Sequence, residues 1–259
     1  MNENTQLATE QREAAKELAE ALSGGRFVLF RQRIEPLVAG STEPGFQEIL
    51  IRFLDEDERF LHPGQFFATL ERCGLMFTLD CWVVNAVINW LTDRKRTVNG
   101  DDVPCCSVNL SAESIANPEL LRFVSERLQV PTIPTGRIVF EIPETDAAVH
   151  AIALMDLISQ LAPTGCRFAV AGYSGKHVTP ALLQALGIEF VKIDGVIVQN
   201  LHRDRMSFAM ADEISRSCRD KGIRTIGQFV ELPETVQKLR DLGVDYVQGY
   251  GIAVPEPLD

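Results

Sequence analysis

Residues 167–193 read RFAVAGYSGKHVTPALLQALGIEFVKI, and this stretch decides the fold class. An apolar segment, Arg167–Ala171, is followed by a helical pattern over 178–186 and then by a second apolar segment, Phe190–Ile193. Short strands that alternate with helices are typical of β-α-β units, which place their strands parallel in one sheet. The stretch therefore predicts an α/β fold.

The same alternation extends over most of the chain. The other candidate strands are Phe27–Arg33, Glu48–Leu54, Cys105–Leu110, Ile138–Ile142, Arg224–Gln228 and Tyr246–Val247. Further helical patterns lie at 64–73, 77–93, 118–128, 147–161, 203–221 and 234–242. Eight strands with interleaved helices predict a (β/α)8 barrel of the TIM type. No helix joins the first two strands, which is consistent with an antiparallel pair.

Composition and charge narrow the class of protein. A chain of 259 residues has the usual size of a single barrel domain. No apolar run approaches the ~20 residues that cross a membrane, so no membrane span is expected. The net charge of −11 disfavours DNA or RNA as a partner, since no basic stripe offsets it. The six cysteines lack metal-ligand spacing, so we expect reduced thiols in a cytoplasmic protein.

The first 25 residues differ from the rest. Residues 6–23 are rich in Ala, Leu, Glu, Gln and Lys at helical spacing, and Gly24 and Gly25 end this predicted helix. Two interpretations stay open. Residues 1–25 are either a lead-in helix from an upstream domain or an ordinary N-terminal helix, with the barrel domain covering residues 26–259.

Polar residues interrupt the apolar strands near their carboxyl ends. They are Asn109, Glu141, Lys192, Gln228 and Gln248. A (β/α)8 barrel gathers the carboxyl ends of its strands on one face, where enzymes of this fold carry out their chemistry. We therefore expect these side chains to surround one site.

Six short segments, in this order, resemble those of the EAL domain, a family that hydrolyses the bacterial second messenger cyclic di-GMP. They are QEILIRF (47–53), SVNLS (107–111), FEIPE (140–144), FAVAGYS (168–174), VKID (191–194) and QGY (248–250). The resemblance spans roughly residues 26–257. It implies that Glu48, Asn109 and Glu141 match metal ligands and that Lys192 matches a lysine that helps to hold the attacking water.

The sequence departs from the family pattern where metals are bridged. The family has an Asp-Asp pair that bridges two metal ions at the positions of Ala171 and Gly172, and it has a Glu at the position of Gln228. Two like-charged ions need bridging carboxylates. We therefore expect the four matching residues to be vestigial, no metal to be bound, and the chain not to be an enzyme.

Nucleotide binding depends on a partly different set of residues. The resemblance implies contacts with cyclic di-GMP from Gln32, Leu50, Arg52, Gln248, Gly249 and Pro255. The Arg52 fork suits a phosphate, and a salt bridge to a nearby acid is its alternative role. Asp80 matches a family Asp that accepts hydrogen bonds from a guanine edge. Its alternative role is to stabilise the N-terminus of the helix over 77–93.

Phe229 and Glu231 distinguish this sequence within the family pattern. Phe229 replaces a family Gly at the barrel mouth, where it either packs under a helix or stacks on a purine, a contact worth ~1–3 kcal/mol. Glu231 is placed to accept from the same base. With Ile49 and the missing Asp pair, these residues resemble the C-terminal EAL domain of FimX-type regulators of type IV pili, degenerate proteins that bind cyclic di-GMP and engage a PilZ-domain partner.

Three hypotheses follow. The first is an inactive, metal-independent cyclic di-GMP receptor that follows a diguanylate-cyclase-like domain and signals to a PilZ-domain protein in pilus-driven twitching, at the cell pole. The second is an interaction module that no longer binds nucleotide, which burial of Arg52 and Phe229 away from the barrel mouth would favour. The third is an active phosphodiesterase with an unrecognised ligand set.

Overall fold

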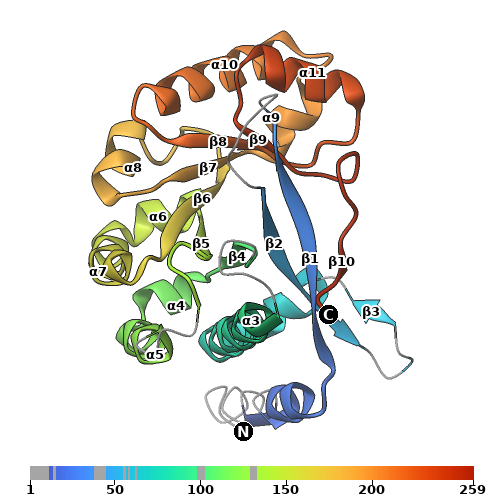
Figure 1. Ribbon diagram of the computed structural model, residues 1–259, viewed down its shortest axis with the longest axis vertical. Coiled ribbons are helices and arrows are strands. Elements are labelled where there is room, and N and C mark those ends of the chain that lie inside the picture. Colours follow the sequence, from blue (N-terminus) through green and yellow to red (C-terminus); the bar gives the residue numbers. More distant parts are fainter. Residues whose placement is uncertain are drawn as a thin grey trace, which may run out of the picture.

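The computed structural model describes residues 12–13, 16–37, 45–54, 57, 59–61, 63–97, 103–128 and 133–259. Eight strands form a closed barrel (Figure 1): β1 (Phe27–Pro36), β2 (Phe46–Leu54), β4 (Cys106–Asn109), β5 (Ile138–Pro143), β6 (Arg167–Tyr173), β7 (Phe190–Ile193), β8 (Arg224–Gly227) and β9 (Tyr246–Val247). Neighbouring strands from β2 through β9 run parallel. Strand β1 closes the barrel and is antiparallel to both β2 and β9. The predicted barrel and its antiparallel first pair are confirmed.

The helices lie outside the barrel wall (Figure 1). They are α2 (Pro63–Arg72), α3 (Met76–Thr97), α4 (Ala112–Ala116), α5 (Pro118–Leu128), α6 (Glu144–Val149), α7 (Ala151–Leu161), α8 (Pro180–Leu186), α9 (Gly195–Asn200), α10 (Arg205–Arg219) and α11 (Pro233–Asp241). Two short strands, β3 (Phe60–Leu61) and β10 (Glu256–Pro257), pair with β2 and β1 outside the wall. The prediction of one helix over 147–161 is wrong, because the backbone leaves the α region at His150 and divides it into α6 and α7.

The side-chain alternation of the strands decides what lies inside the barrel. In β5, Phe140 and Ile142 pack into the large cluster beneath the helices, whereas Val139 belongs to the smaller cluster inside the barrel. Successive side chains point to opposite faces, so Glu141, two residues after Val139, also points inward. The same rule applies to Phe190 and Lys192 in β7. Strands β5 and β7 therefore each carry an apolar interior residue towards the amino end and a polar one nearer the mouth.

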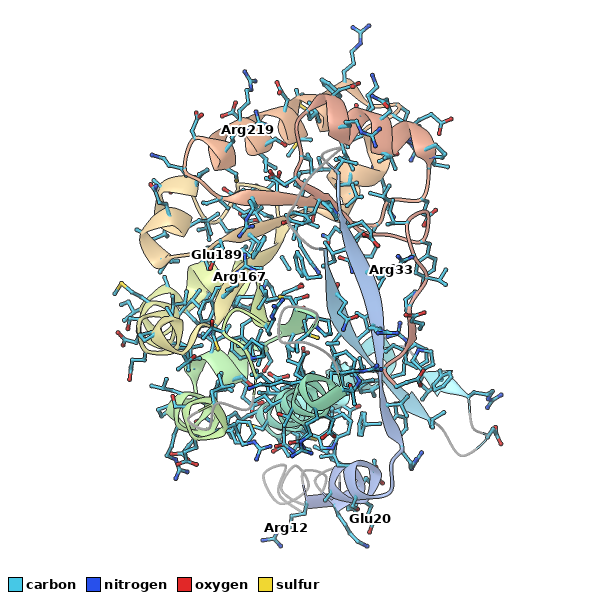
Figure 2. The ribbon with its side chains drawn as sticks, viewed as in Figure 1. Arg12, Glu20, Arg33, Arg167, Glu189 and Arg219 are labelled. Carbon is cyan, nitrogen blue, oxygen red and sulfur yellow. The ribbon has the colours of Figure 1, made fainter. Side chains whose placement is uncertain are left out.

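Arginines surround Phe190, one of the apolar residues inside the barrel. Arg167 and Arg224 lie 4.5 and 4.4 Å from the centre of the Phe190 ring. Both also pair with Glu189 Oε2, at 3.0 and 3.2 Å, and Arg167 and Glu189 are labelled in Figure 2. The two guanidinium groups share one carboxylate and one aromatic ring, a combination that fixes their positions.

In the lead-in segment, residues 12–13 and 16–23 are helical, and Leu18 and Ala21 pack into the core. The helix ends as predicted, since Gly25 has φ +71° and the Arg26 N–H donates to the Ala21 carbonyl at 3.0 Å. The predicted start at residue 6 lies outside the described residues. None of the helices in the described ranges combines the length and apolar character that a membrane crossing requires. All six cysteines are free thiols.

Candidate functional site at the barrel mouth

The inward-pointing polar residues converge on Lys192. Its Nζ atom lies 2.6 Å from Glu48 Oε2 and 2.7 Å from Glu141 Oε1. Asn109 Nδ2 donates to Glu48 Oε1 at 2.8 Å, and Gln248 Nε2 donates to Glu48 Oε2 at 2.7 Å. These five residues, here called the Lys192 cluster, come from five parts of the barrel. Of the polar strand ends expected to surround one site, the structure brings Asn109, Glu141, Lys192 and Gln248 together here, and Gln228 lies apart from these contacts in the lining of the cavity above them.

Burial and charge act against each other in the Lys192 cluster. Burial raises the pKa of Glu141 to about 7, the charge of Glu48 adds to this, and Lys192 opposes it. Burial also acts on Glu48, but Lys192 and the amide donors outweigh it and hold its pKa below the ordinary value of 4.5. Burial lowers the pKa of Lys192, but the two carboxylates outweigh this and hold it above 10.5. At neutral pH Lys192 and Glu48 are therefore charged, with Glu141 partly protonated.

A cavity of about 370 Å³, here called the mouth cavity, opens over this cluster. It is lined by Gln32, Glu48, Leu50, Arg52, Gln228, Phe229, Glu231, Gln248, Gly249, Tyr250 and Pro255. Its volume lies in the range of small-molecule sites. Eight of the nine residues expected to bind nucleotide line it, and Asp80 is the exception. Tyr250, which is exposed, was not assigned a role from the sequence, although it belongs to the QGY segment.

The Arg52 side chain extends from β2 into the mouth cavity, and one hydrogen bond uses only part of its N–H donors. Its Nη1 donates to the Ile51 carbonyl at 2.8 Å, and its guanidinium lies 5.6 Å from the centre of the Phe30 ring. No carboxylate in the described ranges forms an ion pair with it, so the alternative salt-bridge role is not seen there. Gln32 is more constrained, because it donates to the Ala253 carbonyl at 2.8 Å and accepts from Gln248 Nε2 at 3.1 Å.

Phe229 is held in an unfavourable backbone conformation at the cavity rim. Its φ of +56° is the single positive value among the described non-glycine residues. For an L-residue this left-handed conformation costs roughly 1–2 kcal/mol, whereas glycine adopts it freely. The side chain is 57% exposed, so most of the Phe229 ring is open to solvent rather than covered by a helix. Strain of this kind is concentrated at functional sites.

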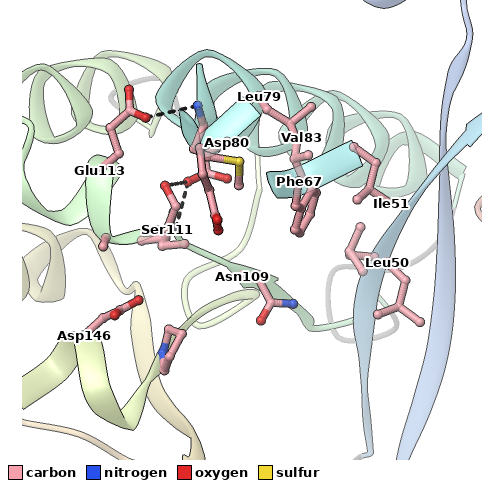
Figure 3. Close-up of a pocket in the computed structure, with 16 residues that line it drawn as sticks. Leu50, Ile51, Phe67, Leu79, Asp80, Val83, Asn109, Ser111, Glu113 and Asp146 are labelled. Atoms are coloured by element: carbon pink, nitrogen blue, oxygen red, sulfur yellow. Dashed lines mark hydrogen bonds between the residues drawn. The ribbon is translucent and has the colours of Figure 1, made fainter. Parts of the chain in front are cut away.

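Asp80 lies in a second cavity of about 540 Å³, here called the apolar cavity (Figure 3). Asp80 Oδ2 accepts from Ser111 N at 2.8 Å, Ser111 Oγ at 2.7 Å and Ser114 Oγ at 2.6 Å. Asp80 thus holds the N-terminus of α4 rather than that of its own helix, α3. Burial raises the pKa of Asp80, and the serine donors oppose this. Leu50 lines both cavities, so the two adjoin.

Glu144 organises the loop that follows the positions of the missing Asp pair. Its carboxylate accepts from Ser174 N at 2.9 Å, Ser174 Oγ at 2.8 Å and His177 N at 3.1 Å. Burial raises the pKa of Glu144, but these donors outweigh it and hold the pKa below 4.5. This role of Glu144 was not predicted, because it depends on a loop that is distant in the chain.

A family model for the EAL domain matches residues 15–255. The chain belongs to the EAL domain family. The cyclic di-GMP phosphodiesterase PdeB of Shewanella oneidensis is 32% identical over 96% of this chain and 29% of PdeB. PdeF of Escherichia coli, a cyclic di-GMP phosphodiesterase, is 25% identical over 93% of this chain and 31% of PdeF. The chain therefore spans about a third of the length of these relatives.

Solved EAL structures share the fold. The FimX EAL domain of Pseudomonas aeruginosa bound to cyclic di-GMP is 26% identical, with a TM-score of 0.84 over 95% of this chain and 98% of that one. The Xanthomonas citri FimX EAL domain in complex with the same nucleotide has a TM-score of 0.86 over 97% of both chains. At 23% identity, that second likeness shows the fold alone.

Two expectations from the sequence are corrected by these relatives. The expectation that the chain is not an enzyme is contradicted, because PdeB, PdeF and the PdeA of Borreliella burgdorferi, 26% identical, are cyclic di-GMP phosphodiesterases. The expectation of no metal is contradicted on the same ground, because EAL phosphodiesterases generally need divalent metal ions. The absence of the Asp pair therefore does not by itself exclude either activity or a metal.

Glu48, Glu141 and Asn109 are the residues of the Lys192 cluster that would hold a divalent cation. Glu48 Oε2 and Glu141 Oε1 lie 2.6 and 2.7 Å from Lys192 Nζ, so the ammonium group occupies the point on which the two carboxylates converge, and a cation would bind beside it. Mg²⁺ is usually held by one or two carboxylates together with substrate phosphates. In the described ranges no three His, Cys, Asp or Glu side chains gather to hold a metal. The candidate donors are therefore these two carboxylates and Asn109, whose amide nitrogen donates to Glu48 Oε1 at 2.8 Å in this structure.

Proposed function

We propose that this EAL domain binds cyclic di-GMP across the mouth of its barrel. The observation that carries the proposal is that eight of the expected nucleotide-binding residues, from separate segments, line one cavity. The complex of the P. aeruginosa FimX EAL domain with cyclic di-GMP supports the choice of ligand, since that domain has the same fold at 26% identity.

The two adjoining cavities suit the two halves of the ligand. One guanine stacks on the exposed Phe229 ring, and Glu231 accepts from its N–H donors. The phosphates lie towards Arg52, whose planar fork pairs with two oxygens. The second guanine enters the apolar cavity, where Asp80 offers the carboxylate oxygen that the two serines leave free.

Calorimetric titration with cyclic di-GMP, in Mg²⁺ and separately in EDTA, tests this proposal. Arg52→Ala and Phe229→Ala are each expected to weaken binding about tenfold or more, from a loss of ~1–3 kcal/mol. Arg33→Ala is the matched control, since Arg33 is exposed and pairs with Glu35 at 2.8 Å, and it should leave the affinity unchanged. No heat at tens of micromolar protein in either buffer would contradict the proposal.

Hydrolysis of the bound nucleotide is a second candidate function, favoured by the three phosphodiesterase relatives. Glu48, Glu141 and Asn109 would hold a divalent ion, which supplies Lewis-acid polarisation of a phosphate oxygen. Lys192, which stays charged, balances the two carboxylates. Incubation with Mg²⁺ or Mn²⁺ and chromatography should yield the linear dinucleotide pGpG, and Glu48→Gln should abolish it. A pGpG yield from the wild type that is no higher than the yield from Glu48→Gln would contradict hydrolysis.

We also propose that nucleotide occupancy is passed to a PilZ-domain partner in pilus-driven motility at the cell pole, and that in the full protein a diguanylate-cyclase-like domain precedes the lead-in helix of residues 1–25. The resemblance of the segment around Phe229 and Glu231 to FimX-type proteins supports this. Linkage requires that a partner which favours the loaded state also tightens nucleotide binding. Pull-down yields of the partner that do not change with cyclic di-GMP would contradict the idea.

A further inference from the structure

Gly195 lies against the ring of Phe229. It is the first residue of α9, between the N-cap Asp194 and the exposed Val196. A Cβ atom added to Gly195 would come within 2.4 Å of Phe229 Cδ2 and 2.9 Å of Phe229 Cε2. Non-bonded carbon atoms prefer a separation of about 3.5–4.0 Å. A side chain at position 195 and the Phe229 ring therefore cannot both keep these places.

The contact on Gly195 supports one part of the ring, and the rest borders the mouth cavity. Phe229 lines that cavity and is 57% exposed. Its φ of +56° shows that the chain tolerates an unfavourable backbone conformation at this residue. The position of the Phe229 ring thus depends on the strained backbone conformation of Phe229 and on the absence of a side chain at Gly195.

A cavity next to Gly195 leaves room for a displaced Phe229 ring. Asp194 and Val196, which flank Gly195, line a neighbouring cavity of about 650 Å³. A ring pushed off Gly195 is therefore not forced back into the mouth cavity by dense packing on this side. Small movements of an aromatic platform matter because stacking on a base requires close contact of the two faces.

We propose that Gly195 is a positioning residue for purine binding. Its missing side chain lets the Phe229 ring rest directly on the start of α9, and the ring then presents its open part to a guanine. The inference rests on the proposed binding of cyclic di-GMP, because the platform has a role only where a base stacks on it. The backbone at Gly195 does not require glycine, because its φ is not in the left-handed region, and the three atoms nearest to an added Cβ all belong to the Phe229 ring.

A double-mutant cycle separates this role from a general effect on α9. Cyclic di-GMP affinity is measured by calorimetry for the wild type, Gly195→Ala, Phe229→Ala and the double variant. Gly195→Ala is expected to weaken binding about tenfold, most of a stacking contact. In the Phe229→Ala background the same substitution should change affinity less than about twofold, because no ring remains to be displaced. Equal losses in both backgrounds would overturn the inference.

Controls keep the outcomes distinct. Gly64→Ala is the matched substitution, because Gly64 lies in the first turn of α2 and a Cβ atom there meets nothing within 4 Å. It should leave affinity unchanged. If Gly195→Ala folds poorly, the double variant, which lacks the clash, should fold and match Phe229→Ala in affinity, and weaker binding would overturn the inference. A wild type that does not bind refutes the proposed function itself, whereas Gly195→Ala that binds like wild type refutes only the role of Gly195.

Discussion

Replacing Lys192 by Met should destabilise the domain strongly, because two buried carboxylates then face each other without a counter-ion. Lys192 and Glu141 are each 1% exposed, and Lys192 Nζ lies 2.6 Å from Glu48 and 2.7 Å from Glu141. Removing one partner of a buried ion pair costs ~3–5 kcal/mol. In a domain of this size each kcal/mol lowers the melting temperature by ~2–4 °C, so a fall of about 6–20 °C is expected.

The loss should depend on pH. In the wild type the pKa of Glu48 lies below 4.5, so its contribution to stability is present above pH 4.5 and is lost as the pH falls through the folded-state value. The contribution of Lys192, whose pKa lies above 10.5, is fully present below pH 10.5. The pKa of Glu141 is raised to about 7, so the stability contribution of Glu141 declines as the pH rises from 4.5 towards 7. Without Lys192 both carboxylates protonate more readily, so the deficit of the variant should be largest above pH 7 and should shrink as the pH falls towards 4.5.

Urea unfolding followed by circular dichroism at about pH 8 and pH 5 measures this deficit on either side of the Glu141 pKa. Lys16→Met is the matched control, because Lys16 is 78% exposed and 3.6 Å from Glu20, and exposed pairs contribute ~0–1 kcal/mol. Adding Glu141→Gln to Lys192→Met removes one of the two facing charges and should restore part of the stability. A deficit below about 1 kcal/mol, or one equal at both pH values, would refute the reasoning.

Three further predictions concern the backbone and the loops. The Phe229→Gly variant should be more stable than the Phe229→Ala variant by ~1 kcal/mol in the free energy of unfolding, because glycine adopts φ +56° without strain. Urea unfolding that ranks the two variants in the reverse order would contradict this. Glu144→Gln should lose ~1–3 kcal/mol at pH 7 through weaker loop hydrogen bonds, and the gap to wild type should narrow as the pH falls below 4.5 and the wild-type carboxylate protonates. If the stability difference between wild type and Glu144→Gln is the same at pH 7 and at pH 4, the charge of the Glu144 carboxylate does not hold the loop. Gly249→Ala should cost more than Gly25→Ala, since its Cβ would come within 2.2 Å of the Val230 backbone whereas that of Gly25 meets nothing within 4 Å. Melting temperatures compare them, and a smaller loss at Gly249 would contradict the close approach.

The regular elements were predictable where they are long or strongly apolar. Strand β7 and helix α5 have the predicted bounds, Phe190–Ile193 and 118–128. Helices α4 and α9 were missed because five or six residues are too few for a helical period to show. The break at His150 was missed because apolar residues continue on both sides of it.

The convergence of the site was also predictable in part. Parallel barrel strands bring their carboxyl ends together, so Glu141, Lys192 and Gln248 had to approach one another once the strands were located. The hydrogen bonds from Ser111 and Ser114 that bind Asp80 were not predictable, because they join the side chain of α3 to the start of a helix that the sequence pattern does not reveal.

The sequence by itself determined the barrel and the polar character of its mouth. A period of two places every second strand residue inside, so a polar residue two positions after a buried interior one must face the same space, as Lys192 does after Phe190. Only the tertiary structure decided the left-handed backbone of Phe229, its contact with Gly195 and the separate cavity of Asp80. These features depend on distances between segments that are remote in the chain, and no local periodicity encodes such distances.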